Sequence, residues 1–384
     1  MKNNRTFLDK LLDGAEVKWK PLEQVVHIAN NARKPVKSSL RVAGNIPYYG
    51  ANNIQDYVEG YTHDGEFVLI AEDGSASLEN YSIQWAVGKF WTNNHVHVIC
   101  SKEELNNRFL YHYLTNMNFI PFLAGKERAK LTKAKLQQIP IPIPPLPVQT
   151  EIVRILDALT ALTSELTSEL NLRQKQYQYY LDSLLEFSNE ITFKSISDIF
   201  HLRNGYTPSK SIKEYWENGL VPWFRMEDIR ENGRILNSSL QTVSKNAVKG
   251  GKFFPANSII VATSATIGEH ALITVPFLAN QRFTVLSLKQ EYIEKFNIYF
   301  LYYYCFLLDE WCNKNTTMSS FASVDMNGFK SFPIPMPPLE VQNRIVSILD
   351  KFETLTNSIT EGLPLAIEQS QKRYEYYREL LLNF

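Results

Sequence analysis

Residues 139–159 read IPIPIPPLPVQTEIVRILDAL, and residues 332–352 read FPIPMPPLEVQNRIVSILDKF. The second stretch repeats the first at a constant offset of 193 positions. The positions that recur unchanged include Pro145, Leu146, Gln149, Ile152, Val153, Ile155, Leu156 and Asp157, which correspond to Pro338, Leu339, Gln342, Ile345, Val346, Ile348, Leu349 and Asp350. A repeat of this length predicts two similar units related by a pseudo-twofold axis.

The repeat extends beyond this phrase in both directions. Downstream, Gln174–Phe187 matches Gln371–Phe384 at an offset of 197, so the second copy carries four extra residues, which lie near Gly362 and Pro364. The start of the chain also repeats the end of the first copy, because Leu8–Leu12 resembles Leu181–Leu185. This circular order predicts that the two chain termini lie close together.

Each copy of the phrase continues into a long helix. Apolar residues at Ile152, Ile155, Leu159, Leu162 and Leu166 are spaced 3, 4, 3 and 4 apart, which is a heptad seam. A helix over 147–187 would be about 60 Å long, too long to be buried in one globule. We expect it to pair with the helix over 339–384 as an antiparallel coiled coil, with a break at Gly362 and Pro364. The alternative is two core helices of a bundle.

The remaining segments, 1–146 and 188–338, have the mixed pattern of α/β (α+β) globular domains. Turn-forming clusters separate short apolar runs that predict strands at 67–71, 96–99, 258–262 and 283–288. Helical patterns at about 103–118 and 291–311 precede the two proline-rich stretches. The sequence therefore predicts two globules, each followed by a long helix.

Charge and composition restrict the class of protein. The formal net charge is zero, with 40 basic and 40 acidic residues, which argues against non-specific coating of nucleic acid. The globules are nevertheless slightly basic, whereas the two repeat helices are acidic, so contacts with DNA would come from the globules. No apolar run approaches the length of a membrane span. The three cysteines form no metal or disulfide pattern, which favours a cytoplasmic protein without a metal site.

Polar loops in both globules are candidates for DNA contacts. Arginine, lysine, asparagine and glutamine side chains reach base edges and phosphates, although surface loops and turns often have the same composition. In the first globule the candidates are Arg33, Lys34, Asn94, His95, Lys126, Arg128 and Lys130, and in the second they are Arg203, Thr207, Ser209, Lys210, Gln281 and Arg282. The basic run 125–135 could bind phosphate or could be a solvated helix face.

The sequence contains no recognisable catalytic motif. It has no GxxxxGK[ST] phosphate loop, no Asn/Asp-Pro-Pro-Tyr/Phe tetrapeptide of the aminomethyltransferases and no carboxylate cluster typical of a nuclease. His95 and His97 would lie on one face of a strand, but two histidines are too few to predict a metal centre. We therefore expect no cofactor and no catalysis by this chain alone.

A proline-rich stretch followed by a Gln-x-x-Ile-x-x-x-Leu helix, present twice after variable globules, resembles the specificity subunits of type I restriction–modification enzymes. Gly205-Tyr206-Thr207-Pro208-Ser209 and Thr266-Ile267-Gly268 in the second globule resemble the target-recognition signatures of this family. The first globule departs from them and has Ile46-Pro47-Tyr48-Tyr49-Gly50 instead, another recurring variety.

The resemblance implies a specific function and specific partners. Each globule would read one half of a bipartite site in double-stranded DNA, with the helices as a spacer between them. Two methyltransferase subunits would dock on the helices, and translocase subunits would join for cleavage. We predict that the partner-binding residues are Gln149, Tyr177, Tyr180, Gln342, Tyr374 and Tyr377.

Two other classes of protein remain as alternatives at this point. A fused restriction enzyme or an orphan methyltransferase would need the motifs that are missing here. A non-catalytic coiled-coil scaffold whose globules bind protein is compatible with the neutral charge. A salt-dependent binding assay on DNA would separate the scaffold from the specificity subunit.

Overall fold

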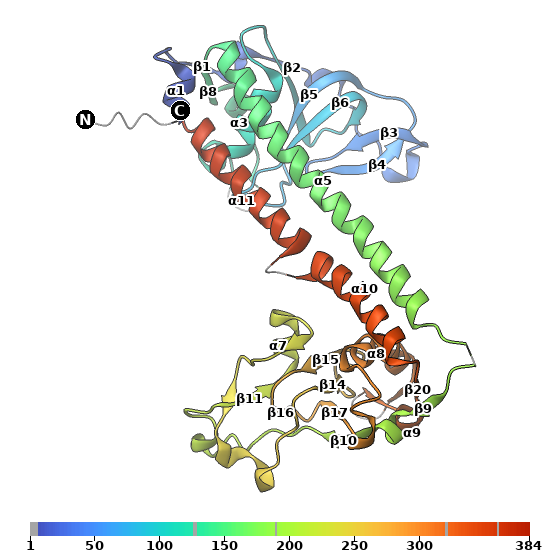
Figure 1. Ribbon diagram of the computed structural model, residues 1–384. Coiled ribbons are helices and arrows are strands. Elements are labelled where there is room, and N and C mark those ends of the chain that lie inside the picture. The colour runs from blue at the N-terminus through green and yellow to red at the C-terminus, as the bar shows by residue number, and fades with distance from the viewer. Residues whose placement is uncertain (1–6, 126–128, 189, 319–321, 359–360) are drawn as a thin grey trace. The chain divides into compact units, whose positions relative to one another are not determined.

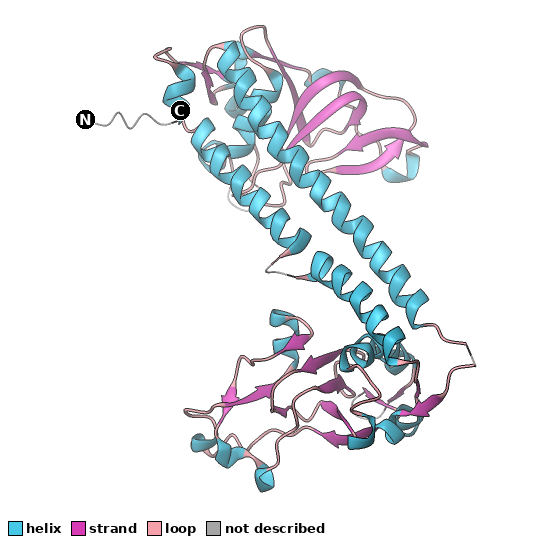
Figure 2. Cartoon of the chain, viewed as in Figure 1, coloured by secondary structure: helices cyan, strands magenta, loops and turns pink. Residues whose placement is uncertain are grey.

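The computed structural model describes residues 7–125, 129–188, 190–318, 322–358 and 361–384 (Figure 1). The chain divides into two units, one formed by Met1–Leu166 with Ile367–Phe384 and the other by Thr167–Ala366. Each unit combines one globule with the helix segments that pack on it, and each contains both helices and strands (Figure 2). The predicted division at residues 146, 187 and 338 separates globules from helices and stays a prediction.

The first unit is built on a six-stranded sheet in the order β2-β7-β5-β6-β3-β4. Its strands are β2 (Val26–Ile28), β3 (Ala43–Tyr49), β4 (Ile54–Val58), β5 (His63–Ala71), β6 (Ile83–Thr92) and β7 (Val96–Ser101). Side chains of β5 alternate between the two faces, so that Val68 and Ile70 join the main core with helix α3 (Asn107–Asn116) and Leu69 joins a smaller cluster around Phe90. The strands predicted at 67–71 and 96–99 lie within β5 and β7.

The second unit contains a five-stranded sheet in the order β10-β17-β14-β15-β12 and a three-stranded sheet in the order β13-β11-β16. The first comprises β10 (Phe200–Asn204), β12 (Ile235–Leu236), β14 (Ser258–Ala262), β15 (His270–Ile273) and β17 (Phe283–Leu288), and the second comprises β11 (Val221–Phe224), β13 (Thr242–Val243) and β16 (Leu278–Ala279). Strands β14 and β17 coincide with the predicted runs. Aromatic side chains of helix α8 (Ile298–Lys314) cover one face of the larger sheet, with Phe300, Tyr302 and Tyr303 buried.

The duplicated sequence forms the same local structure in both units. Strand β1 (Lys18–Pro21) pairs antiparallel with β8 (Pro140–Ile143), and β9 (Phe193–Ser195) pairs in the same way with β20 (Pro333–Pro335). A short helix follows the first strand of each pair, namely α2 (Leu22–Val25) and α6 (Ile196–Ile199). Each proline-rich stretch therefore contains a short strand that lies just before a long helix.

The remaining elements border these sheets. Helix α4 (Lys133–Gln137) precedes β8, and α7 (Met226–Asn232) follows β11. The second unit also contains α9 (Met326–Ser331) and the antiparallel pair of β18 (Thr316–Met318) with β19 (Ala322–Val324).

The long helices follow the predicted positions. Helix α5 (Leu146–Leu185) has 40 residues, and the second copy is split into α10 (Leu339–Asn357) and α11 (Gly362–Leu382). Helix α11 begins at Gly362, whose φ of +79° is accessible to glycine and strained for other residues. The predicted break is thus confirmed, and it lies where the four extra residues are inserted.

In both units the helix segments run antiparallel. In the first unit, Val148 and Ile152 of α5 share a core with Leu381 and Leu382 of α11, and farther from the globule the Thr163 and Ser370 hydroxyls lie 2.8 Å apart. In the second unit, Leu181 and Leu185 of α5 share a core with Ile345 and Val346 of α10. The rings of Tyr177 and Phe352, one or two turns away, lie 6.3 Å apart.

The beginning and the end of the described chain meet in the first unit, as predicted. The ring of Phe7 in helix α1 (Phe7–Leu12) lies 6.4 Å from that of Tyr377, and Leu8 is buried in the core that contains Leu381. Among the described residues no helix has the length and apolar character needed to span a membrane, and no group of histidine, cysteine and acidic side chains is arranged to hold a metal ion.

Candidate nucleic-acid interface

Three segments of the second unit meet around a polar hollow of about 300 Å³. They are the loop after β10, the turn between β16 and β17, and the start of α7. Gly205 allows the first two to approach closely, because a Cβ at this position would lie 2.2 Å from the Asn280 carbonyl oxygen. The Tyr206 backbone N–H then donates to the Ala279 carbonyl at 2.7 Å. The loop is thereby held against the turn.

The hollow collects four of the predicted DNA-binding residues, namely Thr207, Lys210, Gln281 and Arg282. The Thr207 hydroxyl donates to the side-chain oxygen of Gln281, which orients the amide. Lys210 and Arg282 bring positive charge, and Glu227 brings one negative charge. Amide and cationic side chains on one concave surface are suited to base edges and phosphates.

Arg225 also lines this hollow and was not among the predicted residues. Its guanidinium lies 5.6 Å from the ring of Trp223, and its Nε is buried without a hydrogen-bond partner in the described structure. The backbone N–H of Arg225 donates to Asp228 Oδ2 at 2.6 Å, which fixes the residue at the start of α7. Arg225 lies between a strand that ends in Trp223-Phe224 and a polar helix, and this position in the sequence could have indicated that it belongs to the site.

Arg203 and Ser209 do not line the hollow. The Arg203 guanidinium lies 4.9 Å from the ring of Phe254, and the Ser209 hydroxyl pairs with that of Ser211 at 2.7 Å. Both residues are exposed, and their contacts with DNA stay predictions.

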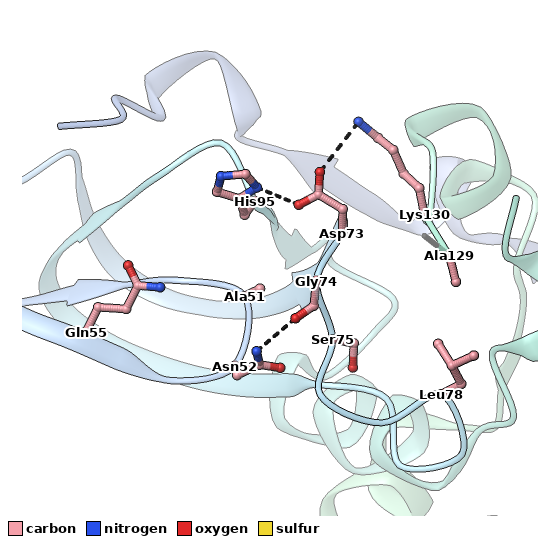
Figure 3. Close-up of a pocket in the computed structure, with 10 residues that line it drawn as sticks. All are labelled: Ala51, Asn52, Gln55, Asp73, Gly74, Ser75, Leu78, His95, Ala129 and Lys130. Carbon is pink, nitrogen blue, oxygen red and sulfur yellow. Dashed lines mark hydrogen bonds and ion pairs between the residues drawn. The ribbon is translucent and has the colours of Figure 1, made fainter. Parts of the chain in front are cut away.

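A larger hollow, of about 780 Å³, lies in the first unit beside the turn after β5 (Figure 3). His95 Nδ1 lies 2.5 Å from Asp73 Oδ1, and Lys130 Nζ lies 4.0 Å from Asp73 Oδ2. The Asn52 amide donates to the Gly74 carbonyl at 2.8 Å, and Gln55 completes the polar lining. The structure thus brings His95 and Lys130 together, around an acidic residue that the sequence analysis did not select.

Lys130 also pairs with Glu72, with Nζ 3.0 Å from Oε1. Burial would raise the pKa of Glu72, but hydrogen bonds from Arg33 and Lys130 hold that pKa below its usual value. The same carboxylate raises the pKa of Lys130. The positive charge of Lys130 is therefore balanced by the Glu72 carboxylate within the protein.

Arg33 is engaged inside the fold. Its guanidinium donates to Glu72 Oε2 and to the Val96 carbonyl, both at 2.7 Å, and its Nε donates to the Asn30 carbonyl at 3.0 Å. These bonds tie the 30–34 segment to β7 and to the turn that carries Asp73. Arg33 supports the edge of the hollow, and a direct contact with DNA stays a prediction.

The other predicted residues of the first globule lie at its surface or outside the described chain. Lys34 is exposed, with its ammonium 5.9 Å from the ring of Trp91, and Asn94 is exposed beside His95. Lys126 and Arg128 lie outside the residues that the structure describes.

The structure corrects three of the predicted partner-binding residues. Gln149 and Gln342 are fully buried, and Tyr177 is 9% exposed in the core of the second unit. None of these side chains is available to another protein, so the prediction was wrong for them. Tyr180 is exposed, and Tyr374 and Tyr377 are half-buried. The most exposed tyrosines of the two repeat helices are instead Tyr179 and Tyr376, which occupy equivalent positions of the repeat.

A family model described as type I restriction modification DNA specificity domain matches residues 15–173 and again residues 189–369. The two matches cover both units and most of both long helices. The chain belongs to this family. The resemblance inferred from the repeated phrase is confirmed.

Relatives in this family match the whole chain. A putative type I restriction enzyme specificity subunit of Haemophilus influenzae is 58% identical over 100% of both chains. The type I restriction enzyme EcoR124I/EcoR124II specificity subunit of Escherichia coli is 36% identical over 99% of this chain and 97% of its own. The crystal structure of the S subunit from M. genitalium has a TM-score of 0.59 at 13% identity and covers 100% of this chain and 96% of that one, which shows a shared fold.

Proposed function

We propose that this specificity subunit is the sequence-specific DNA-binding part of a type I restriction–modification complex and that each unit reads one half of a bipartite site. The observation that carries the proposal is the family match to both halves of a chain whose units repeat the same construction. In the second unit the reading surface is the hollow of Lys210, Arg225, Gln281 and Arg282. In the first it is the hollow that contains Asn52, His95 and Lys130.

The long helices serve as the spacer between the half-sites in this proposal. Antiparallel packing within each unit supports a coiled coil that runs from one globule to the other. The helices also offer a docking surface for two methyltransferase subunits, to which Tyr180, Tyr374 and Tyr377 contribute, and translocase subunits join the complex for cleavage. Such a complex acts on DNA in the cytoplasm. A scaffold that binds only protein is not favoured by membership of the family.

Substitution of Arg282 by alanine is expected to weaken binding of the assembled complex to its cognate site by about 5- to 150-fold. A well-placed arginine–base contact contributes roughly 1–3 kcal/mol of discrimination. Competition among duplexes changed one base pair at a time should show relaxed specificity at one position of one half-site. Arg230→Ala, which changes an exposed arginine of α7 outside the hollow, is the matched control. An equal loss on every duplex would assign Arg282 to the phosphate backbone instead.

The purified chain is expected neither to methylate nor to cleave DNA without other subunits. Its sequence contains no motif for adenosylmethionine or nucleotide binding, and the described residues contain no metal cluster. Transfer of tritium from labelled adenosylmethionine to duplex DNA measures this directly. Methylation by the chain alone, at a level proportional to its concentration and absent from a mock purification, would contradict the proposal.

A further inference from the structure

A buried glutamine lies in the first turn of α5 and makes three hydrogen bonds to backbone groups. Gln149 Oε1 accepts from the Asn106 N–H at 2.7 Å, and Nε2 donates to the carbonyls of Glu104 at 3.1 Å and Pro144 at 2.8 Å. The residue is fully buried. One side chain therefore joins the long helix, the end of the proline-rich stretch before it and the loop before α3.

The second unit repeats this arrangement at equivalent positions. Gln342 Oε1 accepts from the Asn297 N–H at 2.8 Å, and Nε2 donates to the carbonyls of Lys295 at 3.0 Å and Pro337 at 2.8 Å. Gln342 is also fully buried. The globules around the two glutamines differ in sheet order, whereas these three bonds are the same.

The bonds fix the beginning of a helix in each globule. Asn106 and Asn297 are the N-cap residues of α3 and α8, and their side chains accept the first backbone N–H groups of those helices. The N–H of an N-cap residue has no partner within its own helix. The glutamine supplies that partner from the long helix and so couples the ends of two helices.

A second contact lies eight residues farther along each long helix. Asp157 Oδ1 accepts from Arg108 Nε at 2.9 Å and from His112 Nε2 at 2.8 Å, and Asp350 Oδ1 accepts from the Tyr303 hydroxyl at 2.6 Å. Eight residues of helix span about 12 Å. Two contacts this far apart define the direction of the helix on its globule as well as its position.

We propose that Gln149 and Gln342, together with Asp157 and Asp350, are positioning residues that fix the direction in which each spacer helix leaves its recognition globule, and hence the gap between half-sites that the protein accepts. This inference rests on the proposed reading of a bipartite site. None of the four residues lines either polar hollow. They act on specificity through the distance and rotation between the two reading surfaces.

The test is the change Gln149→Leu, measured in the complex with methyltransferase subunits on a series of duplexes whose half-sites are separated by different gaps. The preference for the best gap over gaps one base pair longer or shorter is expected to fall by about tenfold. Three buried backbone groups lose their hydrogen-bond partner, so the direction of α5 on its globule is less firmly fixed. Binding to a duplex with a single half-site should stay within about twofold of wild type. Gln174→Leu, the same change at an exposed position of α5, is the matched control and should alter neither value.

A distance measurement within the first unit tests, without DNA, whether the bonds of Gln149 fix the direction of α5 on its globule. Spin labels at Lys133→Cys in α4 and Ala161→Cys in α5, in a Cys100→Ser background, report the direction of the helix relative to the globule. Both labelled positions are exposed, and the other two cysteines are buried. Gln149→Leu should broaden the distance distribution. An unchanged distribution with an unchanged gap preference would overturn the inference.

The change Gln342→Glu makes gap selectivity depend on pH, which a general loss of stability would not do. At pH 9 the carboxylate would face the Lys295 and Pro337 carbonyls, which repel it, and gap selectivity should fall. At pH 6 a carboxyl buried in this site is protonated and donates again, so selectivity should recover in part. Selectivity at pH 9 equal to that of wild type would count against the inference.

Tyr303→Phe removes only the bond to Asp350 and leaves the packing of the ring, so it serves if the glutamine variants do not fold. A measurable loss of gap preference is expected from it, smaller than that from Gln149→Leu. Equal preference in Tyr303→Phe and wild type would then overturn the inference. If the wild-type complex itself shows no preferred gap on any bipartite duplex, the proposed function fails, and the distance measurement alone decides whether the direction of α5 on its globule is fixed.

Discussion

Insertion of four residues after Ser168 in α5 is expected to change the gap between half-sites that the complex prefers, by about two base pairs. Four residues lengthen a helix by about 6 Å, and base pairs are about 3.4 Å apart along duplex DNA. The bases read within each half-site should stay the same, because the insertion lies outside both polar hollows. Selection of bound duplexes from a library with a randomised gap measures both properties together.

Ser168→Ala, which changes an exposed side chain without changing the length of the helix, is the control for this experiment. The second copy of the repeat already carries four additional residues between α10 and α11. The insertion would make the two copies equal in length. If the preferred gap is the same before and after insertion, the helices do not set the spacing.

Acidification from pH 7.5 to pH 5.5 is expected to destabilise the first unit. Burial lowers the pKa of His63, His97 and His112. A histidine whose pKa is lower in the folded state stabilises the fold above its unfolded pKa of about 6.5, and this contribution is lost as the pH falls through the folded pKa. Each such histidine adds a slope of up to about 1.4 kcal/mol per pH unit to the unfolding free energy.

The surroundings of His112 show why the neutral ring is favoured. Nε2 lies 2.8 Å from Asp157, while Nδ1 is buried without a hydrogen-bond partner in the described structure. Protonation would place an unpaired N–H there, and the positive charge of the ring would be repelled by the Arg108 guanidinium, which shares Asp157. The attraction of Asp157 opposes this effect but is smaller than the effect of burial.

Hydrogen exchange of peptides from the first unit, followed from pH 7.5 to pH 5.5 and corrected for the intrinsic rate, measures this loss. His112→Gln keeps a donor toward Asp157 and cannot be protonated, so it should reduce the pH slope. Protection that is the same at both pH values in the wild-type protein would refute the prediction.

Much of the fold could be predicted because the residues of the repeated phrase strongly favour particular secondary structures. Prolines end the strand before Leu146, the heptad spacing specifies a helix, and Gly362 marks the break. The strands 258–262 and 283–288 could be predicted from their apolar runs because all of their residues except Leu288 are buried. The order of the strands in each sheet depends on contacts between distant segments and could not be predicted from these patterns.

The functional residues were predicted less well, for a physical reason that Gln149 and Arg225 illustrate. A glutamine that recurs in a helical repeat can face a partner or face inward, and only the positions of Glu104 and Asn106 decide that it is buried. Arg225 becomes part of a surface because a loop and a turn from distant parts of the sequence close around it. The turn 280–282 was found because its polar residues directly precede a recognisable strand.

The contact between α1 and the C-terminal helix brings the beginning and the end of the described chain together in the first unit. Phe7 and Tyr377 are in contact, and the ring of Phe384 lies 6.0 Å from that of Phe109 in the same unit. A circular permutant, with a short linker between the present ends and new ends between Leu185 and Phe193, would keep every core cluster of both units. The contacts within each globule would therefore be the same whichever globule came first in the chain.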